Sequence, residues 1–574
     1  MRTELRVGLI ELYATNDGSL LGSRMKDLYS VVRLPSRATE LLAAILREAG
    51  IPNVKTFNPL YNRFRGRFHA EELRELAGMD VVGISAITRT QPPSYELAAR
   101  LKAVNPGLWV VLGGPHVTAH PEEALRFGDV VVRREGDRTL PELVHRIAAN
   151  PADPFLGDVP GISFRAPDGQ FVHNPERPFL SSEELSGLPF PDYPDLVRKG
   201  ISHSVMVTSR GCPFHCDFCA VIAHFGSRYR YLCAERTVEL IEHTLKQVRK
   251  PIFFGDDNFH ALPDRTRAIL ETVLRRGIAM PPWGAQVRVE AAGDREMLGL
   301  MRRAGCERLY VGFESVNDRT LKLFHKQSSH EKNEAAIRRF HQAGFSLHGM
   351  FVLGSDEDTV ETVRETLRFA KQTMLGTAQF FSLTPLPGTP LTDRYSREGK
   401  ILSRDWCRYD AHHVTVRPVR IEPHVLQREL ARAHLKFYSW KEAFRHLLFS
   451  KDRLSNAMIR IAGNALSRRI RRQLRPYGAQ LALLQRWTDE VESRYQRLRR
   501  QLGDRVQSLG QGLSQTTAPV RSSAEEFVRW LRGSLERIPQ EFRSYAQRYV
   551  ASRAEAILAA AVSQDRLSES LPRG

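Results

Sequence analysis

Three of the six cysteines in this chain of 574 residues fall within one short segment. They are Cys212, Cys216 and Cys219, and their spacing is C-x3-C-x2-C. Thiolates are soft ligands that select iron–sulfur clusters, copper(I) or zinc. A closed structural zinc site needs a fourth ligand, and the only nearby candidate, His215, lies awkwardly between the cysteines. Zinc and iron–sulfur both remain hypotheses at this point. A [4Fe–4S] cluster on three cysteines would leave one iron open to bind and reduce a substrate.

The elements that must position these cysteines follow an α/β pattern. In residues 1–150, five short β-branched runs alternate with helical stretches, which is typical of a parallel sheet covered on both faces. We therefore predict a doubly wound, Rossmann-like domain, in which ligands bind at the carboxyl ends of the strands. The predicted strands are Arg6–Leu12, Val54–Phe57, Asp80–Ser85, Leu108–Leu112 and Asp129–Val132, and the predicted helices include Arg37–Glu48, His69–Ala77, Ser94–Ala103 and Pro121–Phe127.

The next segments predict a linker and a second α/β unit. Residues 151–200 are dense in proline and glycine, which predicts a linker with a small hairpin around Pro167–Gln170. In residues 201–420 six longer βα units predict a partial (β/α)6 barrel, with chemistry at the C-terminal ends of its strands. The cysteine segment follows the first of these strands. The predicted strands are His203–Thr208, Pro251–Phe254, Trp283–Val289, Arg308–Gly312, Leu347–Leu353 and Gln379–Leu383.

Residues 421–574 show only helical patterning and predict a helical C-terminal region. Much of the formal net charge of +19 falls here, which indicates an anionic partner such as lipid headgroups or nucleic acid, or a solvated helix face. The predicted helices are Leu430–Leu448, Leu454–Leu474, Leu481–Leu502, Ala524–Leu535 and Ile538–Val562, with a break at Gly510–Ser522.

One of these segments, Ile459–Leu474, mixes apolar residues with arginines in the manner of an interfacial helix. It motivates the hypothesis of peripheral contact with an anionic membrane, through which the protein would reach a polycyclic or isoprenoid substrate. The slightly favoured alternative is a helix that packs on the barrel with its arginines in water.

Composition sets the remaining limits. A chain of this length forms three or four structural units, and its 42% hydrophobic and 26% charged residues are ordinary for a soluble protein. The longest apolar run is far shorter than the roughly 20 residues that span a bilayer. The N-terminus lacks the apolar region of a signal peptide, and six cysteines are too few for a disulfide framework. We expect a cytoplasmic protein, with attachment at the inner face of the membrane as a hypothesis.

The cysteine segment resembles that of the radical S-adenosylmethionine (SAM) superfamily. The resemblance rests on C-x3-C-x2-C with the aromatic Phe218 before the last cysteine, on the loop after the first strand of a βα barrel. It implies that Cys212, Cys216 and Cys219 hold a [4Fe–4S] cluster whose open iron is chelated by SAM. One electron, from an external donor of flavodoxin or ferredoxin type, then cleaves SAM to a 5′-deoxyadenosyl radical, so the difficult chemistry belongs to the cofactors.

Other strand ends agree with this resemblance. Gly312-Phe313-Glu314-Ser315 resembles the family's G-x-E segment, whose carboxylate orients the methionine amino group. The fifth strand, ending at Gly354, resembles the surface against which adenine lies. Asp256 and Asp257 are expected at the barrel mouth, and for them and Arg288 a structural ion pair is an equal alternative. The implied SAM contacts are Phe218, Arg288, Gly312, Glu314, Ser315 and Gly354.

The first domain resembles the cobalamin-binding domain of one large radical SAM subfamily. Ser85-Ala86-Ile87 approximates its S-x-L element and Gly113-Gly114 matches its Gly-Gly element, which implies that Ser85, Gly113 and Gly114 contact cobalamin. The motif D-x-H-x-x-G is absent, and the expected place, residues 58–63, holds no histidine, so the lower cobalt face would lack a protein ligand. His116 could approach a ligand or cap the next helix. With Glu135-Gly136-Asp137 and Thr384–Leu391, the resemblance covers about residues 1–440.

Four functions follow as hypotheses. The favoured one is a cobalamin-dependent radical SAM methyltransferase that acts on an unactivated carbon or phosphorus of a small-molecule or lipid-like substrate. The alternative is a radical cyclase that forms a ring oxidatively on a polycyclic or lipid-like substrate. RNA modification and a non-catalytic cobalamin or redox sensor are less favoured, and nucleic acid is not expected as a partner. No catalytic side chain is assigned from the sequence.

Overall fold

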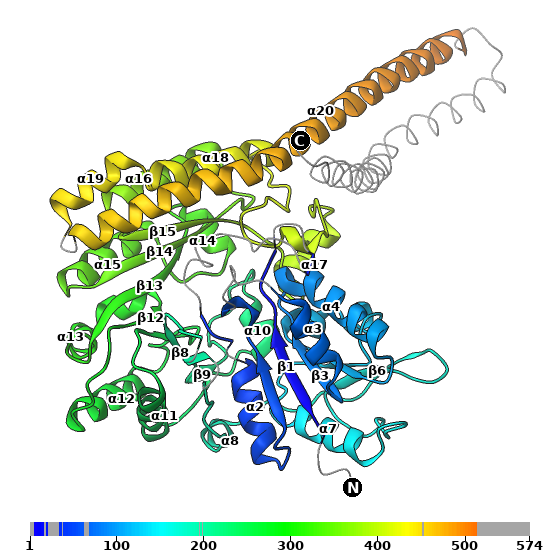
Figure 1. Cartoon of the computed structure of the whole chain (residues 1–574). Coiled ribbons are helices and arrows are strands. Elements are labelled where there is room, and N and C mark those ends of the chain that lie inside the picture. The colour runs from blue at the N-terminus through cyan, green and yellow to red at the C-terminus, as the bar shows by residue number, and fades with distance from the viewer. Residues whose placement is uncertain are drawn as a thin grey trace, which may run out of the picture.

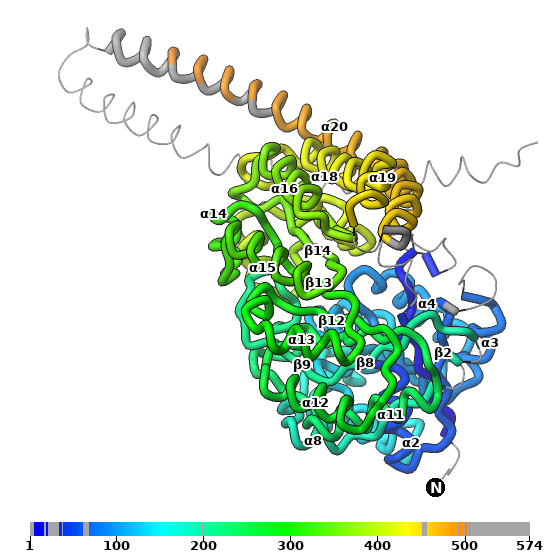
Figure 2. The backbone as a smooth tube through the Cα atoms, turned by 90° about the vertical axis from the view of Figure 1, so that its left-hand side faces the viewer, coloured from blue at the N-terminus to red at the C-terminus, as the bar shows by residue number. Residues whose placement is uncertain are grey.

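The computed structural model describes residues 5–15, 19–20, 34–36, 38–61, 68–193, 196–197, 199–450 and 453–513. Two α/β units lie side by side, and a layer of helices from the C-terminal part covers the far strands of the second unit (Figure 1). A view from the side shows the same three parts, with the first unit against the early strands of the second (Figure 2). The interface between the two units contains a cavity that is lined by residues of both.

The first unit is built on a sheet with the strand order β2-β1-β3-β4-β5-β6-β7, in which the first five strands run parallel. This order, with helices on both faces, confirms the doubly wound prediction. The parallel strands are β1 (Val7–Glu11), β2 (Val54–Phe57), β3 (Val81–Ser85), β4 (Trp109–Gly113) and β5 (Val130–Val132). The helices are α2 (Ala38–Glu48), α3 (Ala70–Ala77), α4 (Gln91–Val104), α5 (Pro115–Ala119), α6 (Pro121–Ala124) and α7 (Thr139–Ala149), with 3-10 turns at Pro59–Tyr61 and Thr88–Thr90.

The hairpin expected within residues 151–200 is present and belongs to the first sheet. Its strands are β6 (Ile162–Arg165) and β7 (Phe171–His173), and β6 pairs antiparallel with β5. The hairpin therefore covers an edge that would otherwise expose unpaired backbone groups. After it, α8 (Ser182–Ser186) begins with a capping box, in which Ser181 and Glu184 satisfy each other's backbone N–H groups.

The second unit has six parallel strands in the order β8-β11-β12-β13-β14-β15, which is their order along the chain. Each βα unit thus adds the next neighbour, and the predicted partial barrel is confirmed. The strands are β8 (Ser204–Met206), β11 (Ile252–Phe254), β12 (Trp283–Val287), β13 (Cys306–Glu314), β14 (Ser346–Leu353) and β15 (Thr377–Ser382). The helices are α10 (Ala220–Phe225), α11 (Ala234–Gln247), α12 (Pro263–Arg275), α13 (Arg295–Arg303), α14 (Asp318–Leu323), α15 (His330–Gln342), α16 (Val360–Gln372) and α17 (Pro390–Arg397), with 3-10 turns at Val289–Gly293 and Trp406–Arg408. A short pair, β9 (Ser209–Arg210) and β10 (Arg230–Tyr231), frames the cysteine segment.

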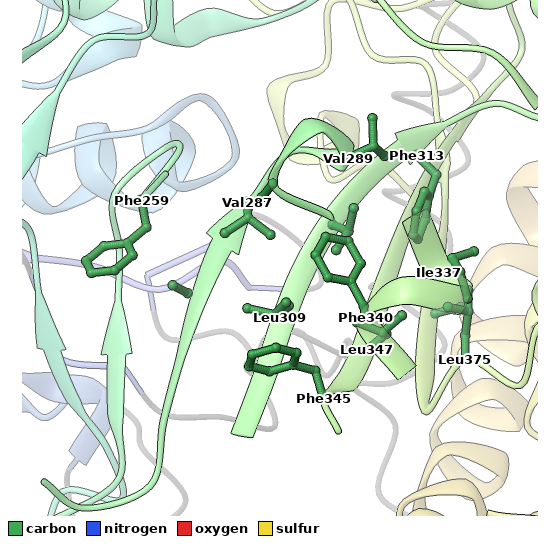
Figure 3. Close-up of a cluster of buried hydrophobic side chains, with 14 of the residues drawn as sticks. Phe259, Val287, Val289, Leu309, Phe313, Ile337, Phe340, Phe345, Leu347 and Leu375 are labelled. Carbon is green, nitrogen blue, oxygen red and sulfur yellow. The ribbon is translucent and has the colours of Figure 1, made fainter. Parts of the chain in front are cut away.

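The core of the barrel lies between its strands and the outer helices. Leu309 and Leu347 on neighbouring strands meet Phe340 and Phe345 from the segment that joins them (Figure 3). All four side chains are almost fully buried. Aromatic and branched side chains of this kind bury large apolar areas, which fixes the strand ends that carry the polar residues discussed below.

The C-terminal helices differ from the sequence prediction in two places. The expected helix Leu430–Leu448 is divided into α18 (Pro423–Phe437) and α19 (Trp440–Phe449), because Ser439 caps α19 by accepting a hydrogen bond from the backbone N–H of Glu442. The expected helices Leu454–Leu474 and Leu481–Leu502 are one helix, α20 (Arg453–Leu513), which passes through Pro476. Packing on both sides of Pro476, by Leu474, Tyr477 and Leu481, offsets the lost hydrogen bond. The helices expected after residue 513 lie outside the described residues.

The apolar residues of Ile459–Leu474 are divided between the protein interior and the surface, where Ile461 is 40% exposed. Ile470 and Leu474 are buried, whereas Arg468, Arg471 and Arg472 are exposed, as in the alternative of a helix packed on the barrel. The C-terminal part of α20 extends away from the body of the protein (Figures 1 and 2). No helix among the described residues combines the length and the apolar character needed to cross a bilayer.

Candidate active site

The cysteine segment leaves the barrel at β8 and turns sharply at Gly211. This glycine has φ +80°, and a Cβ there would lie 2.5 Å from the carbonyl oxygen of Arg228, so no other residue fits without a shift. Burial raises the pKa of all three thiols, that of Cys219 to about 12. Neutral thiols that are at least partly buried suit a centre that displaces their protons and binds the thiolates.

The three thiols do not converge on one point. Within the described residues, no group of three His, Cys, Asp or Glu side chains could hold a single metal ion. This arrangement does not fit a mononuclear zinc site, which needs its ligands at about 2.0–2.3 Å from one ion. A [4Fe–4S] centre has a different requirement, because each of its cysteines binds a different iron.

Asp217, between the second and third cysteines, fixes the segment to the later part of the barrel. Its carboxylate lies 2.6 Å from Nδ1 of His325 and accepts a hydrogen bond of 2.8 Å from Arg394. The next residue, Phe218, packs on Phe324 with a ring-centroid distance of 4.9 Å. The segment is therefore held by contacts that are distant along the chain, as a site that must keep its geometry requires.

Arg288, at the end of β12, reaches the cysteines. Its guanidinium lies over the ring of Phe214, 3.6 Å from the centroid, donates a hydrogen bond of 3.0 Å to Glu290, and interacts electrostatically with Cys216. Burial by itself would lower the pKa of Arg288, but Glu290 and Cys216 raise it above the ordinary value. Arg288 is thus a permanent cation beside the cysteines, in the place where a carboxylate ligand could meet it.

Glu314 ends β13 in an unusual conformation. Its φ is +62°, in the left-handed region that costs energy for a residue with a side chain. Its carboxylate folds back over Gly312, where a Cβ would collide with it, and accepts a hydrogen bond of 2.9 Å from Lys326. Both side chains are nearly buried, and both act electrostatically on Cys216. The arrangement holds a carboxylate ready for an ammonium group, a position that Lys326 takes here.

Ser315 directly follows β13, and Gly354 directly follows the neighbouring strand β14. Their contacts hold the two strand ends in place. Ser315 is fully buried, and its carbonyl and that of Phe313 accept hydrogen bonds from Asn333. Gly354 has φ +103°, and its N–H donates to the carboxylate of Asp358 at 2.9 Å. Ser315 and Gly354 therefore shape the strand ends through their backbone groups.

The two aspartates after β11 have different surroundings. Asp256 follows β11 at the C-terminal ends of the strands, as expected, but its side chain is fully buried. It accepts hydrogen bonds from the N–H and hydroxyl of Thr208, at 3.1 and 2.9 Å, and from the hydroxyl of Ser209. Asp256 therefore holds the strand that leads to the cysteines, which is the structural alternative. Asp257, by contrast, acts electrostatically on Cys212 and Cys219 and lines a cavity.

That cavity has a volume of about 790 Å³ and lies between the two α/β units. Such a volume is in the upper part of the range for cofactor sites. Its wall combines the carboxyl ends of the first sheet, the apolar linker and the root of the cysteine segment. The residues that define its extent are Glu11, Ser85, Gly113, Gly114, Arg134, Leu188, Phe190, Ser209, Arg210, His224 and Asp257.

The three residues expected at cobalamin lie together in this wall. Gly113 and Ser85 are paired neighbours at the ends of β4 and β3. Gly114 has φ +105°, and a Cβ there would lie 2.6 Å from the carbonyl oxygen of Ala86. These bare strand ends fit a broad, flat group that approaches the backbone closely. His116 does not line the cavity: it is fully buried and lies 3.3 Å from Glu123.

A buried ion network joins the two units at the edge of the cavity. Arg210, directly before the cysteine turn, donates two hydrogen bonds of 2.7 and 2.8 Å to Asp137 and lies 3.1 Å from Glu135. Arg230, on the paired strand β10, donates to Glu135 at 2.7 Å. The Glu135-Gly136-Asp137 segment thus binds the strand that carries the cysteines, and the distance between cavity and cysteines is fixed by charge-assisted hydrogen bonds.

Sequence reasoning missed Lys326, Arg210 and His224. The partners of Lys326 and Arg210 are distant along the chain, so the sequence does not reveal these pairs. The sequence shows only that Arg210 lies next to the cysteine segment. His224 follows the third cysteine by five residues and lines the cavity, with Nδ1 buried and without a partner. Burial and the nearby Arg210 and Arg134 lower its pKa to about 4, so it is neutral at pH 7.

Comparison with known protein families agrees with both units. The model for the radical SAM superfamily matches residues 206–370, and the model for the B12 binding domain matches residues 30–144. An uncharacterized methyltransferase of Pyrococcus horikoshii is 30% identical over 401 residues, which cover 67% of this chain and 84% of the relative. The anaerobic magnesium-protoporphyrin IX monomethyl ester cyclase of Rubrivivax gelatinosus is 28% identical over 437 residues, which cover 72% of this chain and 75% of the relative.

Among solved structures, the fold is similar to that of the cobalamin-dependent SAM radical enzyme OxsB with aqua-cobalamin and SAM bound. The TM-score is 0.60 at 16% identity, and the match covers 93% of this chain and 84% of that chain. The chain therefore belongs to the radical SAM superfamily, in the group that carries a B12-binding domain, and it is an enzyme that uses a [4Fe–4S] cluster, SAM and cobalamin.

Proposed function

We propose that this enzyme transfers a methyl group from SAM, by way of cobalamin, to an unactivated centre of a small apolar substrate. The observation that carries the proposal is the position of Asp257, which lines the interdomain cavity and also acts on Cys212 and Cys219. This position supports a cobalamin site next to the cluster site. When bound, the cluster and SAM supply a 5′-deoxyadenosyl radical that activates a C–H or P–H bond, and cobalamin supplies the methyl group.

The cysteines and the ends of β12 to β14 form the proposed SAM and cluster site. Cys212, Cys216 and Cys219 bind the cluster as thiolates. Glu314 exchanges Lys326 for the amino group of SAM, and Arg288 faces its carboxylate. We assign the remaining contacts to the residues predicted from the sequence, which are Phe218, Gly312, Ser315 and Gly354.

Ser85, Gly113 and Gly114 form the proposed floor of the cobalamin site. Gly113 presents open space to the cavity, since a Cβ there would approach only the carbonyl oxygen of Val132, at 3.9 Å. The mixed polar wall from Arg134 to Asp137 can hydrogen-bond amide side chains of the cofactor.

For the substrate we propose a polycyclic or lipid-like small molecule, and for the electron a flavodoxin- or ferredoxin-type donor. The relative from Rubrivivax gelatinosus is named for a magnesium-protoporphyrin substrate, which is polycyclic. That relative is a cyclase, and oxidative ring formation is therefore the second candidate. The relative from Pyrococcus horikoshii is named a methyltransferase, which supports methyl transfer as the first.

The test is an anaerobic reconstitution with iron, sulfide and hydroxocobalamin, followed by EPR and visible spectra. Wild type and Cys407→Ala, a cysteine outside the segment, should both bind a [4Fe–4S] cluster and form 5′-deoxyadenosine, whereas Cys216→Ala should do neither. Incubation with methyl-labelled SAM and an extract of apolar small molecules should then place the label in a product. An unlabelled, oxidised product would overturn methyl transfer in favour of cyclisation, and bound zinc without a cluster would overturn both.

A further inference from the structure

Helix α19 is amphipathic in the opposite sense to most surface helices. The side turned toward the barrel carries the polar residues Glu442 and His446, both buried. Glu442 pairs with Lys371 of α16 at 2.7 Å, and His446 lies 2.7 Å from Arg460 of α20. The outward side carries large apolar side chains that are between 41% and 75% exposed: Trp440, Phe444, Leu447, Leu448 and Phe449.

Helix α20 continues this apolar area. Its first turns lie antiparallel to α19, in a register set by Ser450 with Asn456 and by His446 with Arg460. This register places Leu448 level with Met458, which is 60% exposed, and Ile461 is 40% exposed one turn further on. We call these seven side chains the α19–α20 surface: Trp440, Phe444, Leu447, Leu448, Phe449, Met458 and Ile461. They are seven of the fifteen exposed large hydrophobic residues in the described part of the chain.

Positive charge is concentrated in the segment that carries the α19–α20 surface. Residues 440–480 contain ten Lys or Arg and two Asp or Glu, a net charge of +8 out of the +19 of the whole chain. Four exposed arginines of α20 lie further toward its C-terminus, from about two turns after Ile461: Arg468, Arg471, Arg472 and Arg475. Apolar side chains flanked by cations are the composition of surfaces that bind the headgroup region of anionic bilayers.

We propose that the α19–α20 surface docks the enzyme on an anionic membrane. A second copy of the chain is a poorer occupant, because it would bring together two segments that each carry a net charge of +8. The chain's own residues 514–574 are not acidic either, with nine Arg against seven Asp or Glu. Nucleic acid would match the arginines but not five outward Trp, Phe and Leu side chains. An anionic bilayer matches both the charge and the apolar area.

The surface is separate from the cofactor site. Arg460 donates a hydrogen bond of 2.7 Å to the carbonyl of Leu375, just before β15 begins, and Arg445 donates to the carbonyl of Lys371 at the end of α16. Both contacts lie at the N-terminal ends of the strands, whereas the cysteines lie at the C-terminal ends. Docking therefore holds the enzyme at the membrane and leaves the cofactor site open. It does not depend on which reaction the enzyme performs.

The test is co-sedimentation of the full-length holoenzyme with phosphatidylcholine vesicles, with and without phosphatidylglycerol. Wild type should bind only the phosphatidylglycerol vesicles, and less at high salt. The variant Phe444→Ser with Phe449→Ser should bind about tenfold more weakly or worse, since each phenyl ring loses its burial in the bilayer. Arg468→Gln with Arg472→Gln should also bind more weakly. The matched control is Phe155→Ser, because Phe155 is 67% exposed but lies on the first unit.

All substituted side chains are exposed, so circular dichroism and cobalamin content should match those of wild type. Absence of wild-type binding to phosphatidylglycerol vesicles at low salt would overturn the proposal. So would equal binding by wild type and the double phenylalanine variant, which would place the contact elsewhere. If light scattering shows that the same variant instead turns a dimer into a monomer, a second copy is the occupant and the membrane proposal is wrong.

Discussion

Replacing Arg210 with methionine removes the cation that joins the two α/β units and keeps the length of its side chain. The side chain of Arg210 is 13% exposed, and its partners Asp137 and Glu135 are 5% and 7% exposed. Glu135 keeps Arg230 as a partner, whereas Asp137 loses both of its hydrogen bonds of 2.7 and 2.8 Å. Removing one partner of a buried pair costs about 3–5 kcal/mol, because a charge is left without compensation.

We therefore expect Arg210→Met to lower the free energy of unfolding by about 3–5 kcal/mol. Adding Asp137→Asn to that variant should recover part of the loss, because the buried carboxylate charge that lacks a partner is then removed. The assay is urea unfolding of the four proteins of this cycle, read in the first transition because a two-unit chain need not unfold in one step. A loss below about 1 kcal/mol, or a double variant as unstable as the sum of the singles, would refute the argument that the network is a coupled buried pair.

The pH dependence gives the same cycle a second readout. Burial by itself would raise the pKa of Asp137, but Arg210 and Arg230 lower it below the ordinary value. In wild type this carboxylate therefore stabilises the fold above its unfolded pKa of about 3.9, and the contribution is lost as pH falls through the lower folded pKa. In Arg210→Met burial dominates and the folded pKa rises, so the stability deficit should shrink as pH falls from 7 toward 4. A deficit that is constant over this interval would contradict the assignment.

Three further predictions test single positions. Gly312→Ala should weaken SAM binding about tenfold or more with cluster content unchanged, because its Cβ would collide with the Glu314 carboxylate; isothermal titration of the reconstituted enzyme measures this. Lys326→Met should destabilise the apoenzyme by about 3–5 kcal/mol and bound SAM should restore part of that loss, whereas equal losses with and without SAM would argue against a shared carboxylate. Gly114→Ala should abolish cobalamin retention while leaving the [4Fe–4S] EPR signal, because its Cβ would lie 2.6 Å from a backbone oxygen.

Most of the scaffold could be predicted from the sequence because its elements follow simple periodicities. Strands such as Val81–Ser85 and Val130–Val132 are continuous apolar runs, and their observed ends lie within two residues of the predicted ones. The C-terminal helices were less predictable. Pro476 is a local signal for a helix end, but packing keeps the helix continuous there, whereas Ser439 does cap a new helix. Tertiary burial of Tyr477 and Leu481 kept α20 continuous, and no window of sequence contains that information.

The site likewise contains residues that could be predicted from local motifs and residues that could not. The cysteine spacing, Glu314 and the Gly113-Gly114 pair are local motifs, and the structure brings each to an expected strand end. The role of Asp256 could not be predicted, because its partners Thr208 and Ser209 lie almost fifty residues earlier in the chain. A carboxylate that follows a strand is equally compatible with binding a ligand and with holding a neighbouring strand by hydrogen bonds. The role of Lys326 could not be predicted from the sequence either, because its pairing with Glu314 depends on how the loop after α14 folds back over β13.

The root of the cysteine segment is clamped from two sides, and this explains how the enzyme can place two cofactors at a set distance. From within the barrel, Asp256 binds Thr208 and Ser209, and Arg265 donates to the carbonyl of Thr208 at 3.0 Å. From the first unit, Asp137 binds the very next residue, Arg210. Apolar packing alone tolerates small slides between units, whereas bidentate charge-assisted bonds fix direction as well as distance. Consecutive residues of this segment are therefore bound to both units. Any displacement of the cobalamin-binding domain must also move the segment that leads to Cys212. We expect the two cofactor sites to shift together or not at all.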